Sequence, residues 1–124
     1  MNTTTLELTT QNFDTTLQRK GIVLIDWWAP WCGPCRAFAP VFERAAIKNP
    51  DLTFAKVNTE DQPELAAEFE IRSIPTLMVI RDGVMLYNRP GMLPAAALEQ
   101  LVTSARNVDM ESIRRHLARH AEAV

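Results

Sequence analysis

Residues 21–28, GIVLIDWW, constrain the fold more than any other stretch of this chain. Apolar residues occupy both of the alternating sets of positions, so a strand here is expected to be covered on both faces. Strands of this kind lie in the centre of parallel sheets that carry helices on either side. We therefore expect an α/β protein, and 124 residues are enough for one domain with a substantial core.

The flanking sequence supplies the other elements of such a domain. Periodicity predicts strands at 6–8, 51–57, 75–80 and 84–88, and helices at 9–20, 32–48, 62–70 and 94–106. Thr10 is expected to cap the first helix. Asp82-Gly83, between the last two strands, is a strong signal for a hairpin. The order of elements predicts a central mixed five-stranded sheet flanked by helices on both faces.

The end of the chain carries one more helical pattern. Its apolar residues are spaced three or four apart, as in an amphipathic helix: Met110, Ile113, Leu117, Ala121 and Val124. We therefore predict a domain at 1–106 and a C-terminal helical extension at 107–124. The apolar stripe is expected to dock on the protein's own surface.

Composition argues against several classes of function. A formal net charge of −2 disfavours electrostatic binding to nucleic acid or to anionic membranes. No apolar stretch approaches the roughly 20 residues that span a bilayer. The first ten residues, MNTTTLELTT, lack the basic and apolar regions of a signal peptide. We expect a cytoplasmic monomer that binds neither nucleic acid nor membrane.

The chain has two cysteines, Cys32 and Cys35, with Gly-Pro between them. They could form a redox pair, half of a zinc site or a structural clip. A disulfide that closes so short a loop constrains the unfolded chain very little, which disfavours the clip. His116 and His120 mimic the second half of a zinc finger, but about 80 residues separate the two pairs, where the motif expects about 12 to 15. The redox pair is the interpretation that the spacing favours.

The position of the cysteines at a strand-to-helix turn suits redox chemistry. Cys32 ends the turn and Cys35 follows one helical turn later, a spacing that places their Cβ atoms about 5–6 Å apart. Only a slight adjustment then allows a disulfide. A helix N-terminus stabilises a thiolate at Cys32, whereas Cys35 follows the apolar stripe of Phe38 and Phe42. We expect Cys32 to be the more exposed, attacking thiol and Cys35 the shielded, resolving thiol.

Two charged residues lie on apolar strand faces. Asp26 shares its face with Leu24, and Lys56 shares its face with Phe54. An unpaired buried charge is costly, so the two are expected to be partners. A purely structural ion pair remains the alternative to a functional carboxylate.

The motif WCGPC, preceded by DWWAP and followed about forty residues later by IPT, resembles the thioredoxins over about residues 5–106. The resemblance implies the thioredoxin fold and the reduction of protein disulfides without a bound cofactor. It implies a thioredoxin reductase as electron donor and disulfide-containing proteins as substrates. Protein disulfide isomerases and periplasmic oxidases usually carry a histidine between the cysteines, so Gly-Pro resembles the reducing branch of the family.

The resemblance also implies roles for individual residues. Cys32 is the expected nucleophile, Cys35 the resolving thiol, and Asp26 the buried proton-transfer carboxylate with Lys56 as its neighbour. Pro75 is expected to follow a cis peptide bond and to face the cysteines. The residues expected to border the substrate surface are Trp31, Gly33, Pro34, Ile74, Pro75 and Gly91.

Two features depart from the family pattern. Pro90 stands where an aliphatic or small residue is expected, and it removes a backbone donor from the substrate surface. The extension at 107–124 continues beyond the point where the family typically stops. The competing functional hypothesis is therefore a binding module or scaffold subunit that acts through this helix, with incidental thiols.

Overall fold

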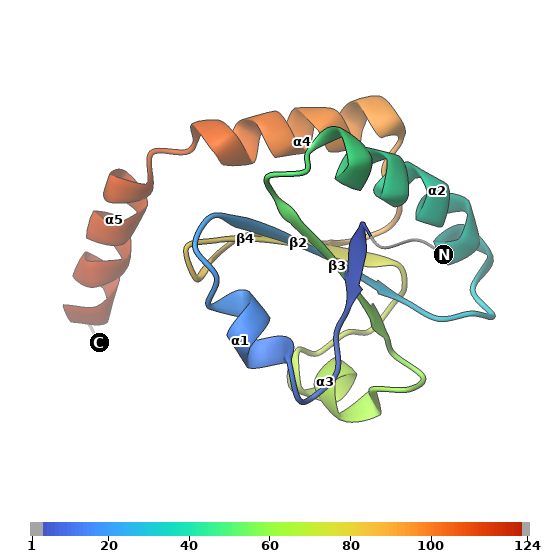
Figure 1. Ribbon diagram of the computed structural model, residues 1–124. Coiled ribbons are helices and arrows are strands. Elements are labelled where there is room, and N and C mark those ends of the chain that lie inside the picture. Colours follow the sequence, from blue (N-terminus) through green and yellow to red (C-terminus); the bar gives the residue numbers. More distant parts are fainter. Residues whose placement is uncertain (1–3, 123–124) are drawn as a thin grey trace.

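The computed structural model describes residues 4–122 and contains a five-stranded sheet with helices on both faces (Figure 1). The strand order is β1-β3-β2-β4-β5, with β1 and β2 parallel to β3, β4 antiparallel to β2, and β5 antiparallel to β4. The strands are β1 (Thr5–Glu7), β2 (Ile22–Trp28), β3 (Thr53–Asn58), β4 (Thr76–Arg81) and β5 (Val84–Pro90). The predicted mixed sheet is confirmed, with β2 at its centre.

Two pairs of helices cover the two faces of this sheet, α2 (Gly33–Lys48) with α4 (Ala95–Asn107) and α1 (Phe13–Leu17) with α3 (Pro63–Glu68). Helix α5 (Met110–Glu122) follows α4 along the chain. Phe38, Phe42 and Leu98, from α2 and α4, pack on one face with Leu24 of β2. Residues of α1 and α3 pack on the opposite face, against Trp27 and its neighbours. Because β2 is buried on both sides, both of its alternating sets are apolar except at Asp26.

The hairpin predicted at Asp82-Gly83 is confirmed. Both residues have positive φ, 51° and 80°, as the tight turn between β4 and β5 requires. A carboxylate oxygen of Asp82 also accepts a hydrogen bond from the backbone N–H of Gly21, at 2.8 Å. The turn is thereby tied to the start of β2.

The first helix is shorter than predicted, and the expectation that Thr10 caps it is wrong. The helix begins at Phe13, with Asn12 in the N-cap position. Asn12 Oδ1 accepts from the backbone N–H of Thr9 at 2.7 Å, and its Nδ2 donates to the carbonyl of Glu7 at 3.0 Å. These side-chain bonds fold residues 9–12 into a turn, because asparagine competes with helical hydrogen bonding.

The C-terminal helix α5 leaves the end of α4 and projects beyond the sheet (Figure 1). Met110 is buried and Ile113 is half-buried, but Leu117 is 47% exposed and Ala121 is exposed. The expected docking is therefore right for the first turn and wrong for the rest of the described helix. The extended conformation of Val108 separates the direction of α5 from that of α4.

Val124, the last residue of the predicted stripe, lies outside the described residues, as do residues 1–3 and 123. Within residues 4–122, no helix is long and apolar enough to cross a membrane.

Candidate functional site

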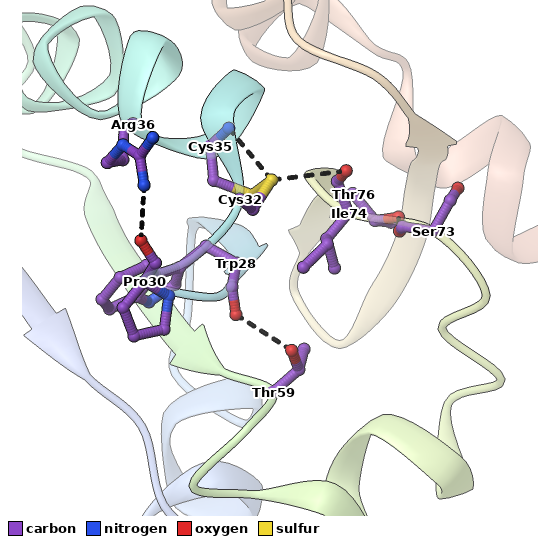
Figure 2. Close-up of a disulfide and its surroundings, with 9 residues drawn as sticks. All are labelled: Trp28, Pro30, Cys32, Cys35, Arg36, Thr59, Ser73, Ile74 and Thr76. Carbon is purple, nitrogen blue, oxygen red and sulfur yellow. Dashed lines mark hydrogen bonds between the residues drawn. A yellow bond between two sulfur atoms is a disulfide. The ribbon is translucent and has the colours of Figure 1, made fainter.

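The two cysteines lie where β2 passes into α2. Cys32 is the N-cap residue of α2 and Cys35 lies in its first turn, and the two form a disulfide with their Cα atoms 5.2 Å apart (Figure 2). Cys32 is 4% exposed and Cys35 is 2% exposed, so the expected contrast in exposure is slight in the disulfide form. The contrast between them lies in their surroundings.

The sulfur of Cys32 faces a helix N-terminus and a neighbouring loop. Its Sγ accepts the backbone N–H of Cys35 at 3.2 Å and lies 3.7 Å from the carbonyl oxygen of Ile74 (Figure 2). An N–H group directed at sulfur, together with the dipole of a 16-residue helix, stabilises a thiolate at this position. Cys35 instead lies on the side of α2 that buries Phe38 and Phe42.

The loop opposite Cys32 contains a cis peptide bond between Ile74 and Pro75. Thr76 Oγ1 donates to the carbonyl of Ser73 at 2.6 Å, and the N–H of Gly91 donates to the carbonyl of Pro75 at 2.8 Å. Gly91 has a φ of 101°, which favours glycine. These bonds connect the segment before β4 to the residue that follows β5.

The residues predicted to border a substrate surface differ in exposure. Trp31 is 66% exposed beside Cys32, although large aromatic side chains are usually buried. Gly33, Pro34 and Gly91 are exposed and Ile74 is half-buried, whereas Pro75 is buried beneath them. The described surface around the disulfide is thus apolar and accessible.

A cleft of about 200 Å³ lies beside Trp31 and Ile74. Its other lining residues are Thr59, Ala66, Ile71, Arg72 and Ser73. Sequence reasoning missed this cleft, because its walls come from the turn before α2, the residue after β3, α3 and the segment before β4. The position of residues 71–73 directly before the IPT motif was the one available signal.

Asp26 is a buried carboxylate on the sheet face covered by α2. It is 0% exposed, and neither carboxylate oxygen has a hydrogen-bond partner among the described residues. Burial raises the pKa of Asp26 to about 7, and the positive charge of Lys56 partly opposes this rise. At neutral pH the group can therefore exist in both protonation states.

Lys56 lies opposite Asp26 in the register of β3 and β2, as predicted. No salt bridge joins Lys56 to a carboxylate in the part of the chain described here, although its positive charge still acts on Asp26. The ammonium Nζ lies 4.6 Å from the centre of the Trp28 ring. A cation–π contact at this half-buried site competes with the carboxylate for the ammonium.

The two histidines considered as zinc ligands lie on α5. His116 and His120 are exposed, and their ring centroids are 4.1 Å apart. The cysteines are bonded to each other at the N-terminus of α2. The structure therefore gives no support to a site shared by the two pairs.

In the reduced, folded protein, Cys32 is expected to react with iodoacetamide at least about tenfold faster than Cys35. The reason is the helix N-terminus and the N–H group that stabilise a thiolate at Cys32. Alkylation at neutral pH, followed by peptide mapping over time, measures both rates. Equal rates under native conditions would contradict the division of roles between the two thiols.

Comparison with known proteins agrees with this geometry. The thioredoxin family model matches residues 4–104. Putative thioredoxin 2 of Streptomyces coelicolor is 54% identical over 116 residues, which cover 94% of this chain and 87% of that protein. Thioredoxin of Alicyclobacillus acidocaldarius is 43% identical over 96 residues, covering 77% of this chain and 91% of that protein.

A solved structure gives the same fold. It comes from work on the thiol resolving mechanism in yeast mitochondrial 1-Cys peroxiredoxin via glutathione/thioredoxin systems. The TM-score is 0.75 at 27% identity, covering 83% of this chain and 97% of that one. The matches and the paired cysteines lead to one conclusion. This chain belongs to the thioredoxin family of thiol-disulfide oxidoreductases.

Proposed function

We propose that this protein reduces protein disulfides by a two-step exchange in which Cys32 attacks and Cys35 resolves. The Cys32 thiolate attacks one sulfur of the substrate disulfide, forming a mixed disulfide and releasing the other substrate sulfur as a thiolate. Cys35, once deprotonated, attacks the Cys32 sulfur, so that the second substrate thiolate leaves and the Cys32–Cys35 disulfide forms. The substrate gains two electrons, and the cysteine pair loses them.

The observation that carries this proposal is the placement of the two sulfurs. Cys32 Sγ accepts an N–H at the helix N-terminus and lies beside the Ile74 carbonyl, whereas Cys35 is on the buried side of α2. A substrate sulfur that meets Cys32 at the surface leaves Cys35 behind it, within disulfide distance. This order favours attack by Cys32 and resolution by Cys35.

Asp26 is proposed to accept the proton of Cys35. Its side chain is on the face that α2 covers, and its oxygens have no other described partner. A carboxylate with a pKa of about 7 takes and returns a proton efficiently near neutral pH. Lys56 is proposed to adjust how readily Asp26 ionises.

The apolar surface around the disulfide is proposed to bind substrate main chain and side chains. Its members are Trp31, Gly33, Pro34, Ile74, Pro75 and Gly91, with the cleft beside Trp31 extending it. Gly33 lies on the open side of this surface, since a Cβ there would meet nothing within 4 Å.

Members of the family are normally reduced by a thioredoxin reductase and act on disulfide substrates. We propose the same for this chain, as a monomer without a bound cofactor. A cytoplasmic location is proposed as well, because a dithiol that donates electrons needs a reducing compartment to restore it.

The experiment that tests this function is insulin reduction driven by dithiothreitol. The unmodified protein is expected to accelerate precipitation of the insulin B chain, and Cys32→Ser is expected to reduce the rate to the background given by dithiothreitol alone. Unaltered acceleration by Cys32→Ser would show that the reaction does not use this thiol. Circular dichroism of both proteins establishes that the variant is folded.

The domain boundary is proposed at residues 1–106, with 107–124 as an appendage that is not needed for reduction. Deleting 109–124 is expected to lower the melting temperature by a few degrees, because Met110 is buried and Ile113 half-buried. Insulin reduction is expected to stay within about threefold, since every proposed site residue precedes the deletion. Met110→Ala should reproduce part of the destabilisation, whereas Leu117→Ala, at an exposed position, should not.

A folded truncation that has lost most of its reductase activity would contradict that boundary. It would favour the alternative that the C-terminal helix is itself the working surface of a binding module. The exposed Leu117 on an amphipathic helix is the observation that keeps this alternative open.

A further inference from the structure

Three charged residues stand in one row across neighbouring strands of the sheet. Lys56 on β3 pairs in register with Glu7 on β1 and with Asp26 on β2. Register partners on parallel strands point to the same face, so all three side chains extend from the face that α2 covers. One ammonium thus stands between two carboxylates whose α-carbons are about 10 Å apart, given a strand spacing of about 4.8 Å.

The row ends in an open cleft. The cleft has a volume of about 340 Å³ and is lined by Thr5, Glu7, Trp28, Lys56 and Asn58. Glu7 is exposed and Lys56 is half-buried, whereas Asp26 is fully buried. Lys56 is therefore the one charged group that adjoins both the solvent-facing carboxylate and the buried one within the described residues.

The ammonium of Lys56 takes neither carboxylate as a direct partner. It lies over the ring of Trp28, which is itself a wall of the cleft. Among residues 4–122, Lys56 is the one cation that acts on Asp26: β4 presents Leu77 at the paired position, the buried residues of α4 are apolar, and α2 contributes the cysteine pair. Burial sets the main rise in the pKa of Asp26, and the position of this ammonium decides how strongly that rise is opposed.

We propose that Glu7 is a positioning residue for Lys56: without a direct ion pair, its negative charge in the shared cleft draws the ammonium towards β1 and limits how close it comes to Asp26. This inference rests on the proposed role of Asp26 as the proton acceptor of Cys35. Without Glu7, the ammonium moves towards the buried carboxylate. A charge at the surface of β1 thereby affects the pKa of Asp26, the proposed proton acceptor of Cys35.

Two effects of Glu7 act in the same direction. Its negative charge disfavours a second negative charge at Asp26, and its attraction for Lys56 weakens the support that Lys56 gives to the ionised form. Both would add to the rise in the pKa of Asp26 that burial causes. Removing the charge with Glu7→Gln should therefore lower the pKa of Asp26, by about 0.3 to 0.5 pH unit for charges about 10 Å apart near solvent. This is about a two- to threefold increase in its acid dissociation constant.

The test is a carbon-13 NMR titration of the Asp26 carboxyl group in the full chain, between pH 5 and 9. Glu7→Gln is expected to lower the midpoint by the stated amount, and Glu7→Asp should retain most of the normal value. Glu68→Gln is the matched control, because it removes one exposed carboxylate from α3, on the other side of the sheet. Addition of 0.5 M salt should shrink the effect, since exposed charges are screened.

A second measurement tests whether Glu7 affects the resolving reaction itself. The rate at which Cys35 resolves a mixed disulfide, measured against pH, should show the same shift in Glu7→Gln and no effect of that change in an Asp26→Asn background. An unshifted NMR midpoint in Glu7→Gln, with Asp26→Asn still altering the rate profile, overturns the inference and leaves the proposed function standing. An Asp26→Asn variant with the unaltered rate profile overturns the inference and the proposed role of Asp26, whereas the exchange by Cys32 and Cys35 is tested separately by Cys32→Ser.

Discussion

Replacing Cys35 with serine is expected to leave a protein that attacks disulfides but does not release them. Cys32 keeps its helix N-terminus, while the thiol that completes the exchange is lost. Mixed disulfides between Cys32 and substrate proteins should accumulate, and multiple-turnover insulin reduction should fall by about a hundredfold or more. Non-reducing gels of the variant after incubation with oxidised substrate proteins measure the adducts directly.

The adducts should disappear on treatment with dithiothreitol and in the double variant Cys32→Ser/Cys35→Ser. A single Cys32→Ser variant should form few adducts, because Cys35 is on the buried side of α2. If both single variants trapped substrates equally well, the assignment of the attacking thiol would be wrong.

Replacing Asp26 with asparagine is expected to stabilise the folded protein at neutral pH. Burial raises the pKa of Asp26 to about 7, against roughly 3.9 for an unfolded aspartate. A raised pKa means that the folded state holds its proton more tightly, so wild-type stability falls as pH rises from about 4 to about 7. The variant escapes this loss, and above pH 7 its advantage should approach about 4 kcal/mol and then level off.

Denaturant unfolding of both proteins between pH 4 and 9 measures this difference. Asp51→Asn provides a control of opposite sign, because a hydrogen bond from Arg106 lowers the pKa of Asp51. A lowered pKa contributes stability above the unfolded value, which is lost as pH falls, so Asp51→Asn should weaken the fold at neutral pH and not in acid. A destabilised Asp26→Asn protein at neutral pH would mean that the carboxylate is a structural partner of Lys56.

Much of the fold could be predicted because local and tertiary preferences agree. Residues 21–28 are apolar on both faces, and β2 is buried on both faces at the centre of the sheet. Asp82-Gly83 adopts the positive φ values that its hairpin needs. The predicted α1 was too long because its boundary depends on where the side chain of Asn12 finds hydrogen bonds, which periodicity does not reveal.

The site was partly predictable for the same reason. The positions of Cys32 and Cys35 follow from the strand-to-helix junction. The pairing of Asp26 with Lys56 follows because each lies near the end of an apolar strand face. The resting place of the ammonium over Trp28 did not follow, since it depends on a contact between side chains of different strands. The cleft at residues 71–73 was missed because its walls meet only in the folded chain.

The resolving step tests the proposed roles of Asp26 and Cys35 together, because Cys35 must lose its proton to Asp26 as it attacks. Reaction of the reduced protein with dithiobis(nitrobenzoate) separates that step from the first attack. One coloured nitrothiobenzoate leaves when Cys32 attacks, and a second leaves when Cys35 displaces it from the mixed disulfide. At high reagent concentration the first phase is complete before the second, and Cys35→Ser defines the first phase alone.

Rapid-mixing absorbance of these two phases at pH 7, in the wild type and in Asp26→Asn, is the most direct test of the mechanism. We predict that the variant keeps the first phase within about twofold and slows the second phase by about tenfold or more, as expected for loss of a general base. A second phase that is equally fast in both proteins would contradict the assignment of Asp26 as the group that takes the proton of Cys35.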